Sequence, residues 1–218
     1  MFEDRILFLD GEALVIDKPS GLAVHPGKRG GPSLEDHLYQ LCFGFARPPS
    51  PVHRLDRDTS GCLLLARNPK AHRRFQRAFE ERKVGKVYLA VLEGRGLASD
   101  GVIDLPLEKI SSREAGWRMA PAESGSPAVT HWKALAERDG LTLVRFEPET
   151  GRTHQLRAHA AYELNAPIAG DPVYGKGEGP LLLHALSLRL EREGKRPIEA
   201  LAPLPPSFHE AGFTDADL

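Results

Sequence analysis

The segment HRLDRDTSGCLLLA, residues 53–66, joins a dense run of charged side chains to a short apolar run. The apolar part, Cys62–Ala66, has the length and composition of a buried strand, and Asp56 stands shortly before it. A second charged segment, TGRTHQLRAH at residues 150–159, leads into a helical stretch. A carboxylate at the edge of a core strand, met by guanidinium groups from elsewhere in the chain, is a way to hold one reactive anion in a cleft. The two segments therefore predict the core and the site together.

Apolar periodicity around these segments predicts a mixture of strands and helices. Strands are expected at residues 6–9, 13–16, 62–66, 86–92, 129–136, 141–147 and 181–190, with turns at residues 10–11 and 139–140. Helices are expected from Ser33 to about residue 43, from near Pro69, and over residues 153–164. Residues 110–127 are expected to form an exposed loop or a loose hairpin. Because strands and helices do not alternate regularly, we expect an α+β fold with a largely antiparallel sheet.

Composition excludes several classes of protein. The chain has 218 residues, 41% of them hydrophobic and 27% charged, which is ordinary for a soluble globular protein with a sizeable core. No apolar run approaches the length of a membrane span, and the N-terminus lacks the basic and apolar regions of a signal peptide. Cys42 and Cys62 form no CxxC pair. These features favour a reduced, cytoplasmic protein over a disulfide scaffold or a zinc module.

The net charge of −1 hides an uneven distribution of charges. Residues 70–86 hold seven basic side chains against two acidic ones, whereas residues 208–218 hold three acidic side chains and no lysine or arginine. A charged run of this kind is most often solvated surface. If the protein binds RNA, four residues of the run are candidates to contact phosphates: Arg73, Arg77, Lys83 and Lys86.

Six segments resemble those of one enzyme family, and they occur in the family's order. They are DKPSGLAVHPG at 17–27, HRLDRDTSG at 53–61, GKVYLA at 85–90, TGRTHQLRAH at 150–159, GDPVYG at 170–175 and LLLHA at 181–185. The chain therefore resembles the RluA family of RNA pseudouridine synthases, enzymes that isomerise uridine within structured RNA. The resemblance implies one catalytic domain over residues 1–218, with a sheet, flanking helices and a central RNA-binding cleft. Many relatives carry an additional N-terminal RNA-binding domain of the S4 type, which is not expected here.

The resemblance also assigns catalytic roles. On the residues alone, Asp56 is equally well interpreted as a turn carboxylate that caps Thr59 or Ser60. The family match makes Asp56 the catalytic aspartate, which attacks the sugar carbon or the base, or removes the C2′ proton. Arg157 is expected to form an ion pair with Asp56. Tyr88 is expected to stack on the target uracil and to take the C5 proton late in the reaction.

Further residues are expected to bind the substrate. By resemblance an aliphatic side chain lies beneath the base; Leu183 fits this role, and Leu182 remains the alternative because strand alternation decides between them. Arg54 is expected to fill the space that the flipped base leaves. The other expected substrate-binding residues are His53, Thr59, Arg152 and His154. His154 and His159 lack the spacing of a metal site, so neither a metal nor a cofactor is expected.

These features together predict an RNA pseudouridine synthase that acts as a monomer on ribosomal RNA, tRNA or both. The segment GVIDLPL at 101–107 is most similar to compact members that modify a ribosomal RNA helix and a tRNA anticodon stem-loop. Two alternatives stay open. One is a non-catalytic RNA-binding relative, which would lack the aspartate, tyrosine or arginine. The other is a hydrolase that cleaves a nucleoside or sugar bond and releases free base.

Overall fold

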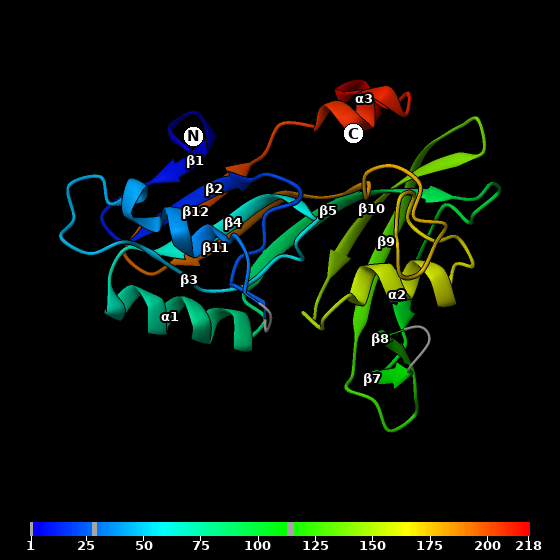
Figure 1. The fold of residues 1–218 in the computed structure, drawn as a ribbon, viewed down its shortest axis with the longest axis horizontal. Coiled ribbons are helices and arrows are strands. Elements are labelled where there is room, and N and C mark those ends of the chain that lie inside the picture. Colours follow the sequence, from blue (N-terminus) through cyan, green and yellow to red (C-terminus); the bar gives the residue numbers. More distant parts are fainter. Residues whose placement is uncertain (1, 28–29, 113–115) are drawn as a thin grey trace. The chain divides into compact units, whose positions relative to one another are not determined.

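The apolar run Cys62–Ala66 lies in a strand, labelled β4 in Figure 1, and is buried as expected. In the computed structural model, which describes residues 2–27, 30–112 and 116–218, this strand is β4 (Ser60–Ala66). Residues Gly61–Ala66 are buried on both faces of the strand. That explains why the run is continuously apolar and does not alternate.

The chain divides into two compact units, each built from two segments. The first comprises Met1–Lys86 and Ala185–Pro203, and the second comprises Val87–His184 and Leu204–Leu218. Two strands, β5 (Val84–Glu93) and β11 (Leu183–Arg192), contribute residues to both. The class is α+β with a large, mostly antiparallel sheet, which confirms the expected fold class. The single catalytic domain over residues 1–218, without an S4 domain, stays a prediction.

The first unit is a sheet whose strands follow the order β1, β2, β4, β11, with β12 paired to β11 and β3 paired to β4. The turn at Asp10–Gly11 joins β1 and β2 as expected, because the Asp10 carboxylate accepts the Glu12 and Ala13 N–H groups at 2.8 and 2.9 Å. Besides β4 and β11, this unit contains η1 (Glu3–Arg5), β1 (Ile6–Leu9), β2 (Ala13–Lys18), η2 (Leu34–Leu41), β3 (Ser50–Pro51) and β12 (Lys195–Leu201).

Helix α1 (Pro69–Glu80) covers this sheet and begins where the sequence predicts. The Asn68 side chain caps it by accepting the Ala71 N–H at 2.9 Å, and proline occupies the first turn. Ala71 and Phe75 are buried against residues of β2, β4 and β11. These residues form one apolar stripe along α1, and the helix expected from near Pro69 is confirmed.

The helix expected after Ser33 is present but is a 3₁₀ helix, η2. Its first turn closes with an i→i+3 bond, from the Asp36 N–H to the Ser33 carbonyl at 3.2 Å. The Asp36 carboxylate in turn accepts the Ser33 N–H at 2.8 Å, so Ser33 is the N-cap, as the sequence indicates. A positive φ of 40° at Phe43, soon after the end of η2, prevents a longer helix.

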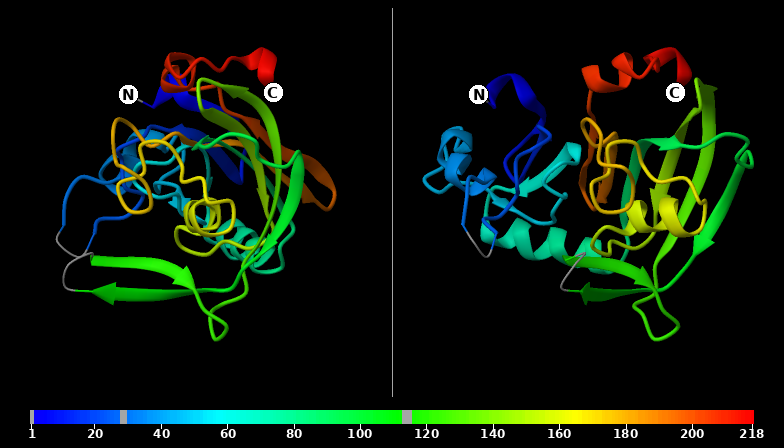
Figure 2. Two further views of the ribbon diagram at one scale, coloured as in Figure 1. Left: turned by 90° about the vertical axis from the view of Figure 1, so that its right-hand side faces the viewer. Right: turned by 45° about the vertical axis from the view of Figure 1, so that its right-hand side comes forward.

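The second unit contains an antiparallel sheet in the order β5, β10, β9, β6, with helix α2 packed on it (Figure 2). The hairpin of β9 and β10 is confirmed, and Asp139 and Gly140 both have positive φ at its turn. Leu156 and Ala160 of α2 pack against Val144, Phe146 and other residues of the sheet. The bounds are β6 (Asp100–Asp104), β9 (Val129–Arg138), β10 (Leu141–Pro148), α2 (Gln155–Tyr162), α3 (Pro206–Glu210) and η3 (Asp215–Asp217).

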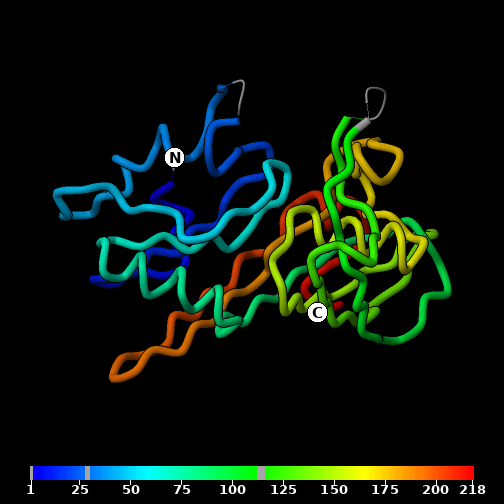
Figure 3. Tube along the Cα trace, turned by 90° about the horizontal axis from the view of Figure 1, so that it is seen from below, coloured from blue at the N-terminus to red at the C-terminus, as the bar shows by residue number. Residues whose placement is uncertain are grey.

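A separate hairpin, β7 (Leu107–Ser112) with β8 (Gly116–Pro121), forms a narrow arm of the second unit (Figure 3). Its strands cover residues 110–112 and 116–121 of the region 110–127, which was expected to be a loop or a loose hairpin, so the second of those alternatives holds; residues 113–115 of that region lie outside the described residues. At its base Leu107 and Met119 are buried together with Ala158 of α2. Within the described ranges no helix is long and apolar enough to cross a membrane.

Candidate active site

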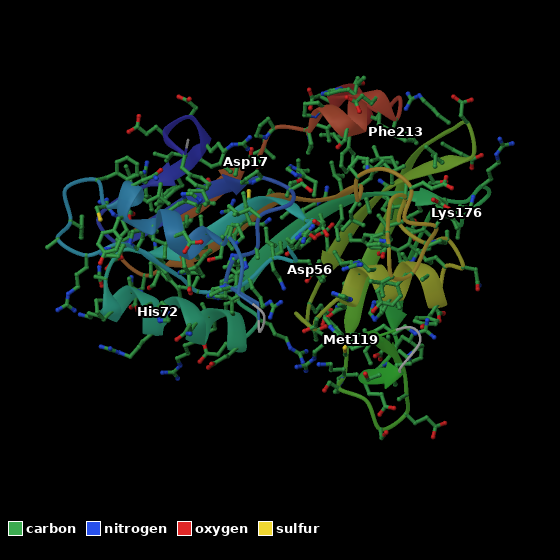
Figure 4. The ribbon with its side chains drawn as sticks, viewed as in Figure 1. Asp17, Asp56, His72, Met119, Lys176 and Phe213 are labelled. Atoms are coloured by element: carbon green, nitrogen blue, oxygen red, sulfur yellow. The ribbon has the colours of Figure 1, made fainter. Side chains whose placement is uncertain are left out.

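Asp56 lies in the loop that leads from β3 to β4 in the first unit (Figure 4). Its carbonyl accepts the Thr59 N–H at 3.2 Å, which closes a tight turn and leaves Thr59 buried. Gly61 ends the turn with φ +104°, and a Cβ there would collide with the Ala185 carbonyl of β11. The glycine of HRLDRDTSG therefore allows the loop to enter the sheet at this point.

Lys18 fixes the residues that follow Asp56. Its side chain is fully buried, and Nζ donates to the carbonyls of Pro19 and Leu22 at 2.8 Å and of Arg57 at 3.0 Å. Burial lowers the pKa of Lys18 to about 8, and the nearby carboxylates, chiefly Asp58 and Asp56, oppose that shift only in part. Ser20 adds a bond from Oγ to the Asp58 carbonyl at 2.8 Å. The DKPSGL segment thus anchors the backbone directly after Asp56.

His53 anchors the other side of the same loop. Its Nε2 accepts the Leu64 N–H at 2.9 Å, and its ring stacks on Phe79 with centroids 4.5 Å apart. Burial, with a smaller contribution from Lys86, lowers the pKa of His53 to about 3, so the imidazole is neutral. These contacts are structural, and the substrate-binding role of His53 stays a prediction. Arg54, the next residue, is exposed.

Tyr88 and Leu183 belong to one apolar cluster of the second unit. Leu183 is buried at the start of β11 and is a member of this cluster. Tyr88 of β5 is half-buried and packs against the same cluster. Leu182 is also buried but lies outside this cluster; its carbonyl accepts the Val91 N–H at 3.1 Å. The shared cluster favours Leu183 over Leu182 as the aliphatic partner of Tyr88.

Arg157 is held by a carboxylate that the sequence analysis did not single out. Its Nε and Nη2 donate to the two carboxylate oxygens of Asp171, each at 2.7 Å, and both side chains are buried. Burial by itself raises the pKa of Asp171, but the hydrogen bond and charge of Arg157 outweigh it, so the pKa lies below its usual value. Asp171 also accepts the N–H groups of Val173 and Tyr174. The guanidinium is thus fixed in one orientation by a bidentate ion pair.

The polar residues that precede α2 position its first turn. Gln155 accepts the Arg152 N–H at 2.9 Å and the Thr150 hydroxyl at 2.7 Å. Its amide donates to the Val129 carbonyl and to Thr130 of β9. Arg152 is exposed and donates from Nε to the Pro127 carbonyl at 3.0 Å. The Thr150 and Gln155 side chains of TGRTHQLRAH therefore hold the loop before α2 in place through hydrogen bonds.

His154 stands at the start of α2 with a positive φ of 51°, which begins the helix two residues later than the sequence predicts. Its ring stacks on Trp117 of β8 at 4.7 Å and meets the edge of Tyr174 at 5.8 Å. Nδ1 lies 3.3 Å from the Tyr174 hydroxyl. His154 therefore links α2 to the β7–β8 hairpin.

The four expected phosphate contacts, all in the first unit, differ in exposure. Arg73 is exposed. Arg77 and Lys83 are also exposed and both pair with Glu81, at 2.7 and 2.6 Å. Lys86 is half-buried, and burial followed by the charge of Arg82 lowers its pKa to about 8. Lys86 is therefore the least suited of the four to a surface phosphate contact.

The expected site residues are divided between the two units. The first unit holds His53, Arg54, Asp56, Thr59 and the four basic residues of the 70–86 run. The second unit holds Tyr88, Arg152, His154, Arg157 and Leu183. The ion pair of Asp56 with Arg157 stays a prediction. In the part of the chain that the structure describes, no three His, Cys, Asp or Glu side chains gather as metal ligands.

The roles of Lys18, Asp171 and Tyr174 were not predicted from the sequence. All three lie in the motif segments DKPSGL and GDPVYG. A lysine two residues after an apolar run, and an aspartate between glycine and proline, are the available signals. Neither signal names the distant partner that gives the residue its role.

Comparison with known proteins identifies the family. Residues 12–162 match the family of RNA pseudouridylate synthases, and these residues are more than half of the chain. The chain belongs to this family. The resemblance stated from the sequence is therefore confirmed, and with it the assignment to isomerases that act on RNA.

Individual relatives agree with this assignment. An uncharacterized RNA pseudouridine synthase of Zymomonas mobilis is 56% identical over 213 residues, which make up 96% of this chain and 97% of that protein. Ribosomal large subunit pseudouridine synthase D of Nitrosomonas europaea is 40% identical over 79% of this chain, and the match covers 50% of that protein. Among solved structures, human RNA pseudouridylate synthase domain containing 4 has a TM-score of 0.81 at 27% identity, covering 96% of this chain and 92% of that one.

Proposed function

We propose that this pseudouridine synthase isomerises a specific uridine in a stem-loop of ribosomal RNA, tRNA or both, with Asp56 as its essential residue. The reaction breaks the C1′–N1 glycosidic bond, rotates the uracil and forms a C1′–C5 bond; C5 loses its proton and N1 gains one, so the product is an isomer of uridine. It needs no oxidant and no second substrate. Asp56 acts as a nucleophile towards the sugar or the base, or as the base that removes the C2′ proton.

The fixed backbone around Asp56 carries this proposal. A carboxylate that reacts with one carbon atom of a bound nucleotide must be held in a narrow range of positions. Lys18 and Ser20 bind the carbonyls of the two residues that follow Asp56, and His53 ties the start of the loop to β4. This degree of anchoring supports a catalytic role over that of a turn residue.

Arg157 and Tyr88 complete the proposed catalytic set. The Asp171 carboxylate engages Nε and Nη2 of Arg157 and thereby orients the guanidinium. In the proposed set Arg157 forms an ion pair with Asp56. Tyr88 stacks on the uracil and accepts the C5 proton, with Leu183 beneath the base. The proposed substrate-binding set is His53, Arg54, Thr59, Arg152 and His154.

Substitution of Asp56 tests the proposal directly. We expect Asp56→Asn to lose at least about 100-fold in the rate of tritium release from C5-labelled uridine RNA, with RNA binding nearly unchanged. Asp58→Asn is the matched control, because it makes the same change two residues away and leaves the backbone bond from Ser20 in place. Near wild-type release by Asp56→Asn would reject the assignment. Free uracil among the products of the wild-type protein would instead identify a hydrolase.

Tyr88→Phe separates stacking from proton transfer. The ring is kept, so we expect RNA binding and glycosidic bond cleavage to persist while little pseudouridine is formed. Product is measured by nuclease digestion and chromatography of the nucleosides. Full turnover by Tyr88→Phe would reduce the tyrosine to a packing role.

The target is proposed to be a loop uridine. An unpaired base costs less to extrude than a paired one, because part of its stacking and pairing is already lost. An isolated anticodon arm or ribosomal stem-loop should therefore be modified nearly as well as the intact RNA. Activity confined to intact tRNA or intact ribosomal subunits would contradict this model.

We further propose that the protein is a cytoplasmic monomer that needs no metal. Exhaustive treatment with EDTA should therefore leave its activity unchanged.

A further inference from the structure

The β7–β8 hairpin exposes a large aromatic side chain. Trp117 of β8 is 43% exposed, whereas the other tryptophan, Trp132 of β9, is 8% exposed. Burial of a tryptophan is strongly favourable, so an indole left half in solvent needs a reason. Exposed aromatic rings are the surfaces on which RNA-binding proteins stack unpaired bases.

A lysine and a histidine lie against the Trp117 indole. The ring of His154 stacks on the indole at 4.7 Å, with 29° between the planes. The Lys109 ammonium lies 4.8 Å from the indole centroid, on the neighbouring strand β7. A cation beside an exposed ring supplies both interactions that a nucleotide needs, a surface for the base and a charge for the phosphate.

The strand that carries Trp117 and the His154 ring that stacks on it are both held by Tyr174. The Tyr174 hydroxyl accepts the Met119 N–H of β8 at 2.9 Å and lies 3.3 Å from Nδ1 of His154. The Tyr174 ring in turn lies 5.4 Å from the Arg157 guanidinium carbon. Contacts therefore run from Arg157 through Tyr174 and His154 to Trp117, entirely within the second unit. This path puts the exposed indole near an arginine of the proposed catalytic set.

Packing of the hairpin does not account for Trp117. Leu107 and Met119 at the base of the hairpin are buried against Ala158, together with Tyr162 and Tyr174. This cluster already attaches the hairpin to α2, so an indole half in solvent farther along β8 adds little to that attachment.

We propose that Trp117 binds an unpaired base of the RNA substrate by stacking, supported by His154. In the complex the base lies on the indole in place of the Lys109 ammonium, which moves to the adjacent phosphate. The proposal rests on the proposed function, because it takes RNA as the substrate. It adds a contact for a nucleotide other than the target uridine.

Binding measurements test the stacking. The probe is a synthetic RNA hairpin with an unpaired, uridine-containing loop, and all variants carry Asp56→Asn so that no turnover occurs. We expect Trp117→Ala to raise Kd by about 5- to 150-fold and Trp117→Phe, which keeps an aromatic ring, to stay much closer to the parent. Tyr39→Ala is the matched control, because Tyr39 is an exposed aromatic, 77% exposed, on η2 of the first unit. An unchanged Kd for Trp117→Ala would overturn the proposal.

Fluorescence gives a readout that does not depend on whether Trp117→Ala folds. We expect the loop hairpin to quench tryptophan emission of the parent protein, and the quenching to disappear in Trp117→Phe, which retains only Trp132. A blunt RNA duplex should quench far less, because its bases are not available. Quenching that persists in Trp117→Phe, or that the duplex produces equally, would overturn the proposal.

The role of Lys109 is tested by the salt dependence of binding. Lys109→Gln should reduce the slope of log Kd against log salt by about one unit.

The two hypotheses fail in different experiments. Tritium release by Asp56→Asn would contradict the proposed function and leave the Trp117 contact standing as an RNA-binding site. An unchanged Kd and unchanged fluorescence would contradict the Trp117 contact and leave the catalytic assignment of Asp56 intact.

Discussion

Each of the two units buries a cation of the proposed site, Lys18 beside the Asp56 loop and Arg157 of the proposed catalytic set, and the two are held in different ways. In the first unit Lys18 donates to three backbone carbonyls, including that of Arg57 directly after Asp56. In the second unit Arg157 donates to both oxygens of the Asp171 carboxylate. The direct partners of Lys18 are therefore neutral carbonyl dipoles, whereas the direct partner of Arg157 is a carboxylate with a full negative charge.

The difference determines what each anchor is suited to do. Carbonyl dipoles compensate a buried ammonium only in part, which is why burial lowers the pKa of Lys18 to about 8. A bidentate carboxylate neutralises the guanidinium and also fixes its plane. Lys18 thus fixes the path of a backbone, whereas Asp171 fixes the orientation of a side chain. We expect the two anchors to respond differently to mutation and to pH.

Removal of the Asp171 carboxylate should have the largest effect on stability. We expect Asp171→Ala to lower the free energy of unfolding by about 3–5 kcal/mol, because Arg157 loses the charge that neutralises it in a buried site. Urea denaturation measures this, with Glu147→Gln as the control, since its exposed pair with Arg145 is worth less than about 1 kcal/mol. Asp171→Asn retains an acceptor for the Val173 N–H and should lose less. A loss below about 1 kcal/mol for Asp171→Ala would remove the distinction between the two anchors.

Lys18→Met should have the second largest effect. The apolar side chain leaves buried carbonyls without their donor, and we expect a loss of about 1–3 kcal/mol in unfolding free energy. The loss is smaller than for Asp171→Ala because the substitution also removes a charge that is costly to bury. Lys70→Met, at an exposed position of α1, is the control. Tritium release should fall as well, because the carbonyl of Arg57 is no longer held; full activity would contradict the role of Lys18 in positioning the loop.

The pH dependence of stability should separate the anchors by pH window, because the unfolding free energy rises with pH in alkaline solution for Lys18 and in acid for Asp171. The Lys18 pKa is about 8 in the folded protein against an ordinary 10.5, so between these values the unfolded chain binds the extra proton and the unfolding free energy rises with pH. Lys18→Met should rise less steeply over that window, while Lys86 contributes equally to both proteins. The Asp171 pKa lies below 3.8, so its contribution is present above that pH and is lost in stronger acid. Parallel curves for wild type and Lys18→Met would contradict the first part.

Exposed cations should show the smallest effect on stability and act on binding instead. Arg73 and Arg77 lie on the exposed face of α1. If they contact phosphates, the double variant Arg73→Glu with Arg77→Glu should flatten the slope of log Kd against log salt by about one unit per lost contact. Arg189→Glu on β11 is the control at another exposed position. If the wild type, the double variant and Arg189→Glu have equal slopes, the exposed face of α1 does not contact RNA phosphates.

Most of the fold could be predicted from local patterns. The buried run in β4, the stripe of α1 and the hairpin of β9 and β10 each carry their signal within a short window. Strand β6 carries none, because only Ile103 of its five residues is buried and pairing with β9 creates the strand. Strand β12 was also missed, because Pro197 interrupts a pattern that pairs with β11 alone.

The candidate site followed a similar division. Asp56, Tyr88 and Arg157 were named because their motifs resemble those of a family whose membership is now confirmed. Asp171 was not named, because its role depends on an arginine fourteen residues earlier in the chain. His154 was predicted as a substrate contact, and its stacking on Trp117 could not be anticipated because the two residues come from different elements.

The sequence by itself determined the family, the α+β class and the residues proposed to act in catalysis, because each depends on residue types at short spacings. The tertiary structure decided which groups hold those residues. The burial of Lys18 beneath the Asp56 loop, the clamp of Asp171 on Arg157 and the exposed stack of Trp117 on His154 all join segments that are separate in the chain. Such contacts depend on how strands pair and helices pack, and local composition carries no record of them.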